Sequence, residues 1–245
     1  NKLYLFTPLI VYMKPICFIA ARAGSKGVVN KNIRIIHGLP LIAHAIKSAK
    51  RSGLFKHIVI STDSLEIKKI AIKFGAEVPF MRPKKLSGDK ISIIDVVIHG
   101  VNSLKSLDYE FDTIVIRDCT VPFLSVDDMR GALSKFSNKK YDGVFAVYKQ
   151  HHNPYFNMVE SDKNGFLKIS KKPKQEIISR QNTPVVYQLN GLFIFDVNSI
   201  LKFKKLFMPN IVPYEIHPLH GFMIDTEYEF KIAALIFKGN LSNFF

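Results

Sequence analysis

Continuous apolar runs of strand length alternate with amphipathic helical patterns through the first half of the chain. Residues 16–19 and 57–61 form two such runs, and each is followed by apolar residues at helical spacing. Gly53 and Gly75 stand where the two helical patterns end, as helix-terminating glycines do. Because strands that are apolar on both faces need cover on both sides, the pattern predicts a parallel sheet between layers of helices.

The second half continues this alternation until a short polar turn interrupts it. The predicted elements are a helix near 91–101, strands at 113–117, 143–148, 190–196 and 211–216, and helices at 125–136, 197–203 and after Glu227. Asn164-Gly165 separates two short apolar stretches, at 155–160 and 166–169, and predicts a β-hairpin. We therefore expect a doubly wound, three-layer α/β domain with a mainly parallel sheet and one β-rich insertion near 143–189.

The loop between the first strand and the first helix, residues 19–34, carries the clearest chemical signal and reads IAARAGSKGVVNKNIR. Four cations, Arg22, Lys26, Lys31 and Arg34, alternate there with glycines, a serine and two asparagines. Exposed backbone N–H groups and cations at the carboxyl end of a buried strand favour a polyphosphate-binding loop. The loop lacks the GxxxxGK[ST] and GxGxxG spacings, so a basic surface loop with turn glycines is the alternative interpretation.

A carboxylate stands at the carboxyl end of another predicted buried strand. Asp118 directly follows the strand at 113–117 and would face the same edge of the sheet as the loop. It is well placed there to hold Mg²⁺ against phosphate oxygens. The histidines at 151–152 are weaker metal candidates, because neighbours in a strand point to opposite faces and no ligand spacing follows them.

The composition describes a folded and strongly basic chain. Its 245 residues suit one α/β domain, 47% of them are hydrophobic, and the formal net charge is +15. The lysines are spread over nearly every predicted helix and form no stripe interleaved with aromatic residues, which disfavours nucleic acid as a partner. A small anionic substrate would be attracted by the same positive field.

Two further features concern the cellular location. Cys17 and Cys119 have no CxxC spacing and are expected to be reduced packing residues of a cytoplasmic protein. Residues 1–12 are largely apolar, but they contain Pro8, are too short to span a bilayer and lack a small-residue cleavage site, so no membrane partner is expected. We expect the natural chain to begin at Met13, with residues 1–12 as upstream or appended sequence.

Short motifs follow one another along the chain in a distinctive order. The first is A-R-x-x-S-K-G at 21–27, followed by K-N-I-R at 31–34 and G-x-P-L-I at 38–42. Further motifs are S-T-D at 61–63, F-G-A-E-V at 74–78, R-P at 82–83, T-x-P at 120–122, R-Q-x-x-P at 180–184, N-G at 190–191 and I-D-T-E at 224–227. In this order, from residue 16 to the C-terminus, the chain resembles the sialic-acid-type cytidylyltransferases, the CMP-N-acylneuraminate synthetase family.

The resemblance implies a fold like the Rossmann and nucleotide-diphospho-sugar transferase folds, in a single cytidylyltransferase domain at 13–245. It implies transfer of cytidylate from CTP to the anomeric hydroxyl of an acidic nine-carbon α-keto sugar, sialic acid or a related nonulosonate, with pyrophosphate leaving. Mg²⁺ would be the cofactor, and the insertion at 143–189 would join two chains in a homodimer. A nucleotidyltransferase for an eight-carbon sugar acid and a non-catalytic nucleic-acid- or anion-binding module are the alternatives. The sequence leaves open whether neuraminate, legionaminate or pseudaminate is used.

The resemblance also implies roles for individual residues. Lys31 would act on the α-phosphoryl group, with Arg22 and Asp225 as the other catalytic residues. The residues expected to bind CTP are Arg22, Ala23, Gly24, Ser25, Lys26, Gly27, Lys31, Asn32, Arg82 and Ser92. Those expected to bind the sugar are Arg180, Gln181, Gln188 and Asn190. Asp118 and Asp225 would bind the metal.

Chemistry bears on the implied cytosine contact and on the implied metal site. Arg82 resembles a cytosine-reading arginine, since a guanidinium can donate to the acceptors O2 and N3 of cytosine; a solvated loop arginine is the alternative. Met223 stands where relatives commonly have a second carboxylate, and its thioether is a poor ligand for Mg²⁺. We therefore expect one essential Mg²⁺ ion. No side chain is a convincing general base, and the metal could lower the pKa of the sugar hydroxyl instead.

Overall fold

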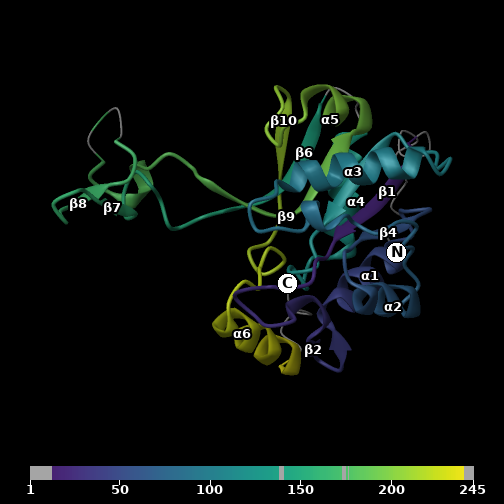
Figure 1. The fold of residues 1–245 in the computed structure, drawn as a ribbon. Coiled ribbons are helices and arrows are strands. Elements are labelled where there is room, and N and C mark those ends of the chain that lie inside the picture. Colours follow the sequence, from purple (N-terminus) through teal and green to yellow (C-terminus); the bar gives the residue numbers. More distant parts are fainter. Residues whose placement is uncertain (1–12, 138–140, 173–174, 176, 240–245) are drawn as a thin grey trace, which may run out of the picture.

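The computed structural model describes residues 13–137, 141–172, 175 and 177–239 (Figure 1). The upstream segment expected at 1–12 lies outside the described residues. Residues 138–140, 173–174, 176 and 240–245 are likewise not described.

A six-stranded mixed sheet forms the centre of the molecule, in the strand order β10-β6-β9-β5-β1-β4 (Figure 1). Its strands are β1 (Pro15–Ala20), β4 (Ile58–Ser61), β5 (Thr113–Arg117), β6 (Gly143–Lys149), β9 (Tyr187–Asp196) and β10 (Ile211–Glu215). β1 pairs in parallel with β4 and β5, and β6 pairs in parallel with β10, whereas β9 is antiparallel to both β5 and β6. β9 is reversed because the chain leaves the sheet after β6 and returns to it without a crossover helix.

Helices cover both faces of this sheet. α3 (Ile93–Lys105) and α5 (Val197–Phe203) pack on the face that carries Ile16 and Phe18 of β1. The opposite face is covered by α1 (Leu41–Ser52), α2 (Leu65–Lys73) and α4 (Val126–Phe136). Successive residues of a strand point to opposite faces, so one apolar strand supplies both cores. The expected three-layer α/β architecture with a mainly parallel sheet is confirmed. None of the helices in the described ranges has the length and apolar character needed to cross a bilayer.

Several helices begin or end at capping residues present in the sequence. The Ser64 side chain accepts a hydrogen bond at the start of α2. Ser125 and Thr226 each form a capping box, at the start of α4 and of α6 (Glu227–Lys238). α1 ends at Gly53, whose φ of 64° lies in the left-handed region that glycine adopts without strain. Local chemistry thus fixes where these helices begin or end.

α6 and the segment before it fold back against the loop that follows β1. A small core joins Val28, Ile36 and Leu41 to Ile224 and Phe230. Between them, β2 (Ile35–Ile36) and β3 (Leu39–Pro40) form a two-stranded ribbon, and α6 lies beside it in Figure 1. The motif at 224–227 is therefore held against the loop at 21–34, although the two are far apart in sequence.

A long arm projects from the sheet between β6 and β9 (Figure 1). It carries a hairpin of β7 (Val159–Ser161) and β8 (Leu167–Ile169), with Gly165 at a φ of 85° in the turn. This hairpin confirms the prediction made from Asn164-Gly165. The boundaries expected for the insertion, 143–189, are wider than the projecting part, because β6 and the beginning of β9 belong to the sheet. Among the described residues, the arm comprises 150–172, 175 and 177–186.

Candidate active site

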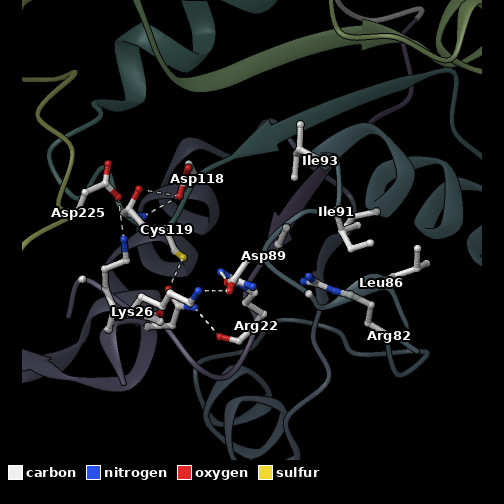
Figure 2. Close-up of a pocket in the computed structure, with 18 of the residues that line it drawn as sticks. Arg22, Lys26, Arg82, Leu86, Asp89, Ile91, Ile93, Asp118, Cys119 and Asp225 are labelled. Atoms are coloured by element: carbon white, nitrogen blue, oxygen red, sulfur yellow. Dashed lines mark hydrogen bonds and ion pairs between the residues drawn. The ribbon is translucent and has the colours of Figure 1, made fainter. Parts of the chain in front are cut away.

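A cavity of about 460 Å³ opens at the carboxyl ends of β1 and β5. It brings together many of the residues singled out in the sequence, namely Arg22, Ser25, Lys26, Gly27, Lys31, Asn32, Arg82, Asp118 and Asp225. Its two sides differ chemically. Asp118 and Asp225 lie on one side, and Arg82 lies on the other beside Leu86 and Ile91 (Figure 2).

The loop after β1 is held in place by hydrogen bonds to neighbouring segments. The Ala23 N–H donates to the Asp63 carboxylate over 2.9 Å, which ties the loop to the end of β4. The buried Asn32 amide donates to the Arg22 carbonyl over 3.0 Å and accepts from the Cys119 thiol over 3.1 Å. Burial raises the pKa of this thiol to about 12, so it stays a neutral donor. Asn32 therefore connects the loop to the turn that follows β5.

Gly27 allows the loop to approach the segment before α6. A Cβ atom at this position would overlap the backbone carbonyl oxygen of Asp225. Because a backbone oxygen cannot move aside as a flexible side chain can, any larger residue would push the loop and the Asp225 segment apart. The glycine in A-R-x-x-S-K-G is therefore required by this contact, in addition to any role beside a ligand.

Lys31 is the most enclosed cation of the loop. It lies in the 3₁₀ turn η2 (Lys31–Ile33), and its side chain is 13% exposed. Its Nζ donates to the Asp225 carboxylate over 2.9 Å and to the Ile224 carbonyl over 2.8 Å. The ammonium group is thereby aimed into the cavity from a fixed position, between the β1 loop and the start of α6.

Arg22 and Lys26 share one acidic partner on the opposite wall. The Asp89 carboxylate accepts from Arg22 Nη2 over 2.6 Å and lies 2.5 Å from Lys26 Nζ (Figure 2). Arg22 Nη1 also donates to the Ser87 carbonyl over 3.0 Å. The loop before α3 thus closes against the loop after β1 through these two cations.

Arg82 is buried rather than solvated, with 6% of its surface exposed. Its guanidinium donates through Nε to the Ser61 hydroxyl, over 3.1 Å, and through Nη2 to the Ser61 carbonyl. Its Nη1 makes no hydrogen bond within the part of the chain that the structure describes. Burial lowers the pKa of this guanidinium, and the nearby Asp63 partly offsets the effect. The solvated-loop alternative is therefore wrong, and Arg82 has a donor to offer inside the cavity.

Asp118 caps the turn that follows β5. Its Oδ1 accepts from the Thr120 N–H over 2.8 Å and from the Thr120 hydroxyl over 2.9 Å. The fully buried Arg117 holds the same turn from beneath by donating to the carbonyls of Asp118 and Val121. Within the described residues, no three His, Cys, Asp or Glu side chains gather as a metal cluster. Asp118 and Asp225 are the two cavity carboxylates that the sequence assigned to a metal.

Several expected site residues do not line this cavity. Ala23 and Gly24 face a smaller cavity on the other side of the loop. Ser92 caps α3 by accepting from the Ile94 N–H, whereas its neighbours Ile91 and Ile93 line the main cavity. The four residues expected to bind sugar are also elsewhere: Arg180 and Gln181 lie on the arm in η4 (Arg180–Asn182), exposed Gln188 accepts from Gln150, and Asn190 is buried in β9.

Two residues that shape the site were missed in the sequence. Asp89 precedes a predicted helix, and an acidic residue at that position is ordinarily explained by capping or by its interaction with the helix dipole. Arg117 ends a predicted buried strand, and nothing local shows that it binds the turn carbonyls. The available signal was a charged residue in a strand predicted to be buried, because arginine is almost never fully buried without a specific partner.

Comparison with known proteins agrees with this geometry. The sequence model of the family described as "Cytidylyltransferase" matches residues 16–231. The chain is similar to the post-translational flagellin modification protein B of Campylobacter coli, with 38% identity over 91% of this chain and 94% of the relative. It is also similar to the CMP-N,N'-diacetyllegionaminic acid synthase of Campylobacter jejuni, with 37% identity over 93% of this chain and 97% of the relative.

Among solved structures, the chain is similar to a CMP:2-keto-3-deoxy-manno-octonic acid synthetase complexed with CTP. The TM-score is 0.69 at 17% identity, over 92% of this chain and 99% of that one. At this level of identity the likeness concerns the fold alone, and it agrees with the three-layer architecture. The family match, by contrast, spans most of the sequence and confirms the resemblance seen in the motifs. The chain belongs to the cytidylyltransferase family and is a CTP-dependent nucleotidyltransferase.

Proposed function

We propose that this cavity is where the enzyme transfers cytidylate from CTP to the anomeric hydroxyl of a nine-carbon α-keto acid sugar, with release of pyrophosphate. One observation carries the proposal: cations of the β1 loop and carboxylates from two other segments line a single cavity at the carboxyl edge of the sheet. The relative named as a synthase of CMP-N,N'-diacetyllegionaminic acid matches over nearly its whole length and supports an acidic sugar of this class.

The two chemical sides of the cavity suggest how CTP lies in it. Lys31 would contact the α-phosphoryl group, and Arg22, Ser25 and Lys26 would contact the outer phosphates. The free Nη1 of Arg82 would donate to an acceptor on the cytosine ring, with Leu86 and Ile91 as apolar walls beside the base. Asn32 would shape the nucleotide pocket by fixing the loop.

The proposed reaction asks the protein mainly for positioned positive charge. Attack of the sugar oxygen on the α-phosphorus forms a new O–P bond and breaks the bond to the β-phosphate oxygen, so charge builds on the equatorial oxygens and on the leaving pyrophosphate. Lys31 is poised for the first of these charges, because its ammonium group is already fixed by Asp225 and the Ile224 carbonyl. Arg22 and Lys26 would neutralise the second.

The carboxylates present suit a magnesium ion. Asp118 and Asp225 line the same cavity from different segments, and Mg²⁺ needs only one or two carboxylates when phosphates and waters complete its coordination. Met223 also lines the cavity, and its thioether adds no suitable ligand. We propose that these two aspartates hold one Mg²⁺, which would supply electrostatic stabilisation of the phosphates and lower the pKa of the attacking hydroxyl.

The arm is proposed to join two chains. Its hairpin exposes a group of apolar side chains, namely Met158, Val159, Phe166, Leu167 and Ile169. A two-stranded hairpin is too small to bury such groups alone, and a second copy of the chain would cover them. The residues proposed to bind the sugar also lie on or next to the arm. Gln188 and Asn190 are at its base in β9, and Arg180 and Gln181 are on it in η4.

Pyrophosphate release tests the proposal directly. The enzyme would be supplied with CTP, UTP or ATP, and with diacetyllegionaminate, pseudaminate, N-acetylneuraminate or an eight-carbon 3-deoxy sugar acid. We expect release only with CTP, and faster with a nine-carbon acid than with the eight-carbon one. A preference for the eight-carbon acid would contradict the substrate class. Absence of release with every one of these acids, together with tight salt-dependent binding to DNA that is insensitive to CTP, would favour the binding-module alternative.

A further inference from the structure

Asp89 lies where two phosphate-binding cations meet. Its two carboxylate oxygens are divided between them, one 2.6 Å from Arg22 Nη2 and the other 2.5 Å from Lys26 Nζ. All three side chains line the main cavity. The arrangement is that of an anion held by a guanidinium and an ammonium group, with a carboxylate of the chain itself as the anion.

The outer phosphates of a nucleotide would need the same donors. Phosphate and carboxylate oxygens are both charged acceptors with similar geometry toward a guanidinium fork, so they compete for one nitrogen atom. Arg22 Nη1 is in a different position, because it is bound to the Ser87 carbonyl and is not part of the competition. When Asp89 dissociates from Arg22, the hydrogen bond from Arg22 to the Ser87 carbonyl remains. The guanidinium therefore stays directed into the cavity.

We propose that Asp89 is an internal counter-anion and a specificity-determining residue for the outer phosphates. The β- and γ-phosphates of CTP displace it from Arg22 and Lys26, and it takes these cations back as pyrophosphate leaves. The proposal rests on the proposed function for the placement of the phosphates. The Asp89 carboxylate would make the protein selective against ligands that reach only the α-phosphate position, since these cannot replace it at Arg22 and Lys26. By competing for the same cations, it would also favour release of the pyrophosphate product.

The exposure of the three side chains makes such an exchange feasible. Arg22, Lys26 and Asp89 are 31%, 80% and 42% exposed, and ion pairs in contact with water are weak compared with buried ones. Hydrogen bonds, chiefly from Lys26 and also from Arg22, keep the pKa of the Asp89 carboxyl below its usual value. The negative charge that competes with phosphate is therefore present at neutral pH. A ligand that brings several negative charges can therefore displace it, and a weakly charged one cannot.

The test compares the affinities of two anions for the full chain, measured by calorimetry without added metal. Sodium pyrophosphate probes the outer-phosphate position, and CMP probes the α-phosphate position. We expect Asp89→Asn to bind pyrophosphate about three- to tenfold more tightly than the unmodified protein, the range that loss of two exposed ion pairs allows. CMP affinity is expected to stay within about twofold. Asp89→Glu, which keeps the charge, should behave like the unmodified protein.

Asp127→Asn is the matched control. Asp127 pairs with Arg130 over 2.6 Å in the same carboxylate–guanidinium manner, on α4 and outside the cavity lining, so its variant should leave both affinities unchanged. Unchanged or weaker pyrophosphate binding by Asp89→Asn would overturn the proposal, as would equal tightening for CMP, which indicates a general charge effect. Because this binding needs no turnover, failure of the enzyme to form a CMP-sugar would refute the proposed function without changing this comparison.

Discussion

The cavity and the arm are built in opposite ways. In the cavity, Arg22, Lys26 and Lys31 each have an acidic partner, and the loop that carries them is bound to the end of β4. In the arm, β7 and β8 pair with each other, and every residue of both strands is exposed. The cavity satisfies its charges within one chain, whereas the arm leaves its apolar groups in water.

This difference separates the role proposed for the single chain from the role for which we propose a second chain. All side chains proposed to contact CTP come from elements packed on or against the sheet, where their geometry is fixed by the fold. The side chains proposed to contact the sugar are divided between β9 and the arm. Substitutions in the cavity should therefore act on chemistry and nucleotide binding, and substitutions in the arm on assembly.

The largest effect is expected for Lys31→Ala. Its ammonium group, fixed by Asp225 and the Ile224 carbonyl, is proposed to face charge that develops in the transition state, and removal of one such donor costs about 10²–10³ in kcat. CTP affinity should change much less. Single-turnover rates and calorimetric CTP affinities would be measured side by side. Lys47→Ala, which removes an exposed lysine of α1, is the matched control. A loss of CTP affinity with turnover intact would show that Lys31 only binds.

Asp118→Asn should lower kcat/KM by about ten- to a hundredfold by weakening the metal site. The amide keeps an oxygen for the Thr120 hydrogen bonds, so the turn after β5 is retained while the charge is lost. The Mg²⁺ concentration needed for half-maximal activity should rise in the variant. If calorimetry without nucleotide found tight, stoichiometric Mg²⁺ binding to the unmodified protein, or if Asp118→Asn kept full activity, the one-metal site would be wrong.

Gly27→Ala tests how far the cavity depends on backbone contact. The added Cβ overlaps the Asp225 carbonyl oxygen, so we expect a loss of about 1–3 kcal/mol in the free energy of unfolding. Turnover should fall as well, because Lys31 and Asp225 would separate. Gly88→Ala is a control for stability, since its Cβ meets only Ile91 Cγ1 at an ordinary 3.7 Å. Equal denaturation midpoints for both variants would show that the loop can accommodate a Cβ atom at position 27 without loss of stability.

Arg82→Ala should reduce the preference for CTP over UTP by about tenfold, measured as the ratio of kcat/KM values. Uracil presents a donor at N3 where cytosine presents an acceptor, and a guanidinium N–H distinguishes the two. The variant also loses its hydrogen bonds to Ser61, so thermal unfolding should be recorded to separate stability from selectivity. Unchanged discrimination in a folded variant would mean that backbone groups read the base.

The sequence predicted most of what depends on local pattern. The strands of the central sheet, the glycine-terminated helices and the cation-rich loop were all visible because each is specified by neighbouring residues, as Gly53 at the end of α1 shows. The reversed direction of β9 was not foreseen, since strand direction depends on how the chain returns from the arm. The pairing of Asp89 with Arg22 joins residues 67 positions apart, and no local pattern encodes it. The burial of Arg82 was hidden for the same reason.

The smallest effect on the cavity is expected from the arm. The double variant Phe166→Asp and Leu167→Asp places charges on side chains that are 68% and 70% exposed, so it removes no packing from the single chain. Sedimentation at micromolar concentration should show a dimer for the unmodified protein and a monomer for the variant. CTP affinity should stay within about twofold, as expected for surface changes far from a site.

Ile72→Asp, on an exposed face of α2, is the matched control and should leave the dimer intact. A monomeric unmodified protein would remove the argument for the arm, and loss of CTP binding in the variant would show that cavity and arm are not independent.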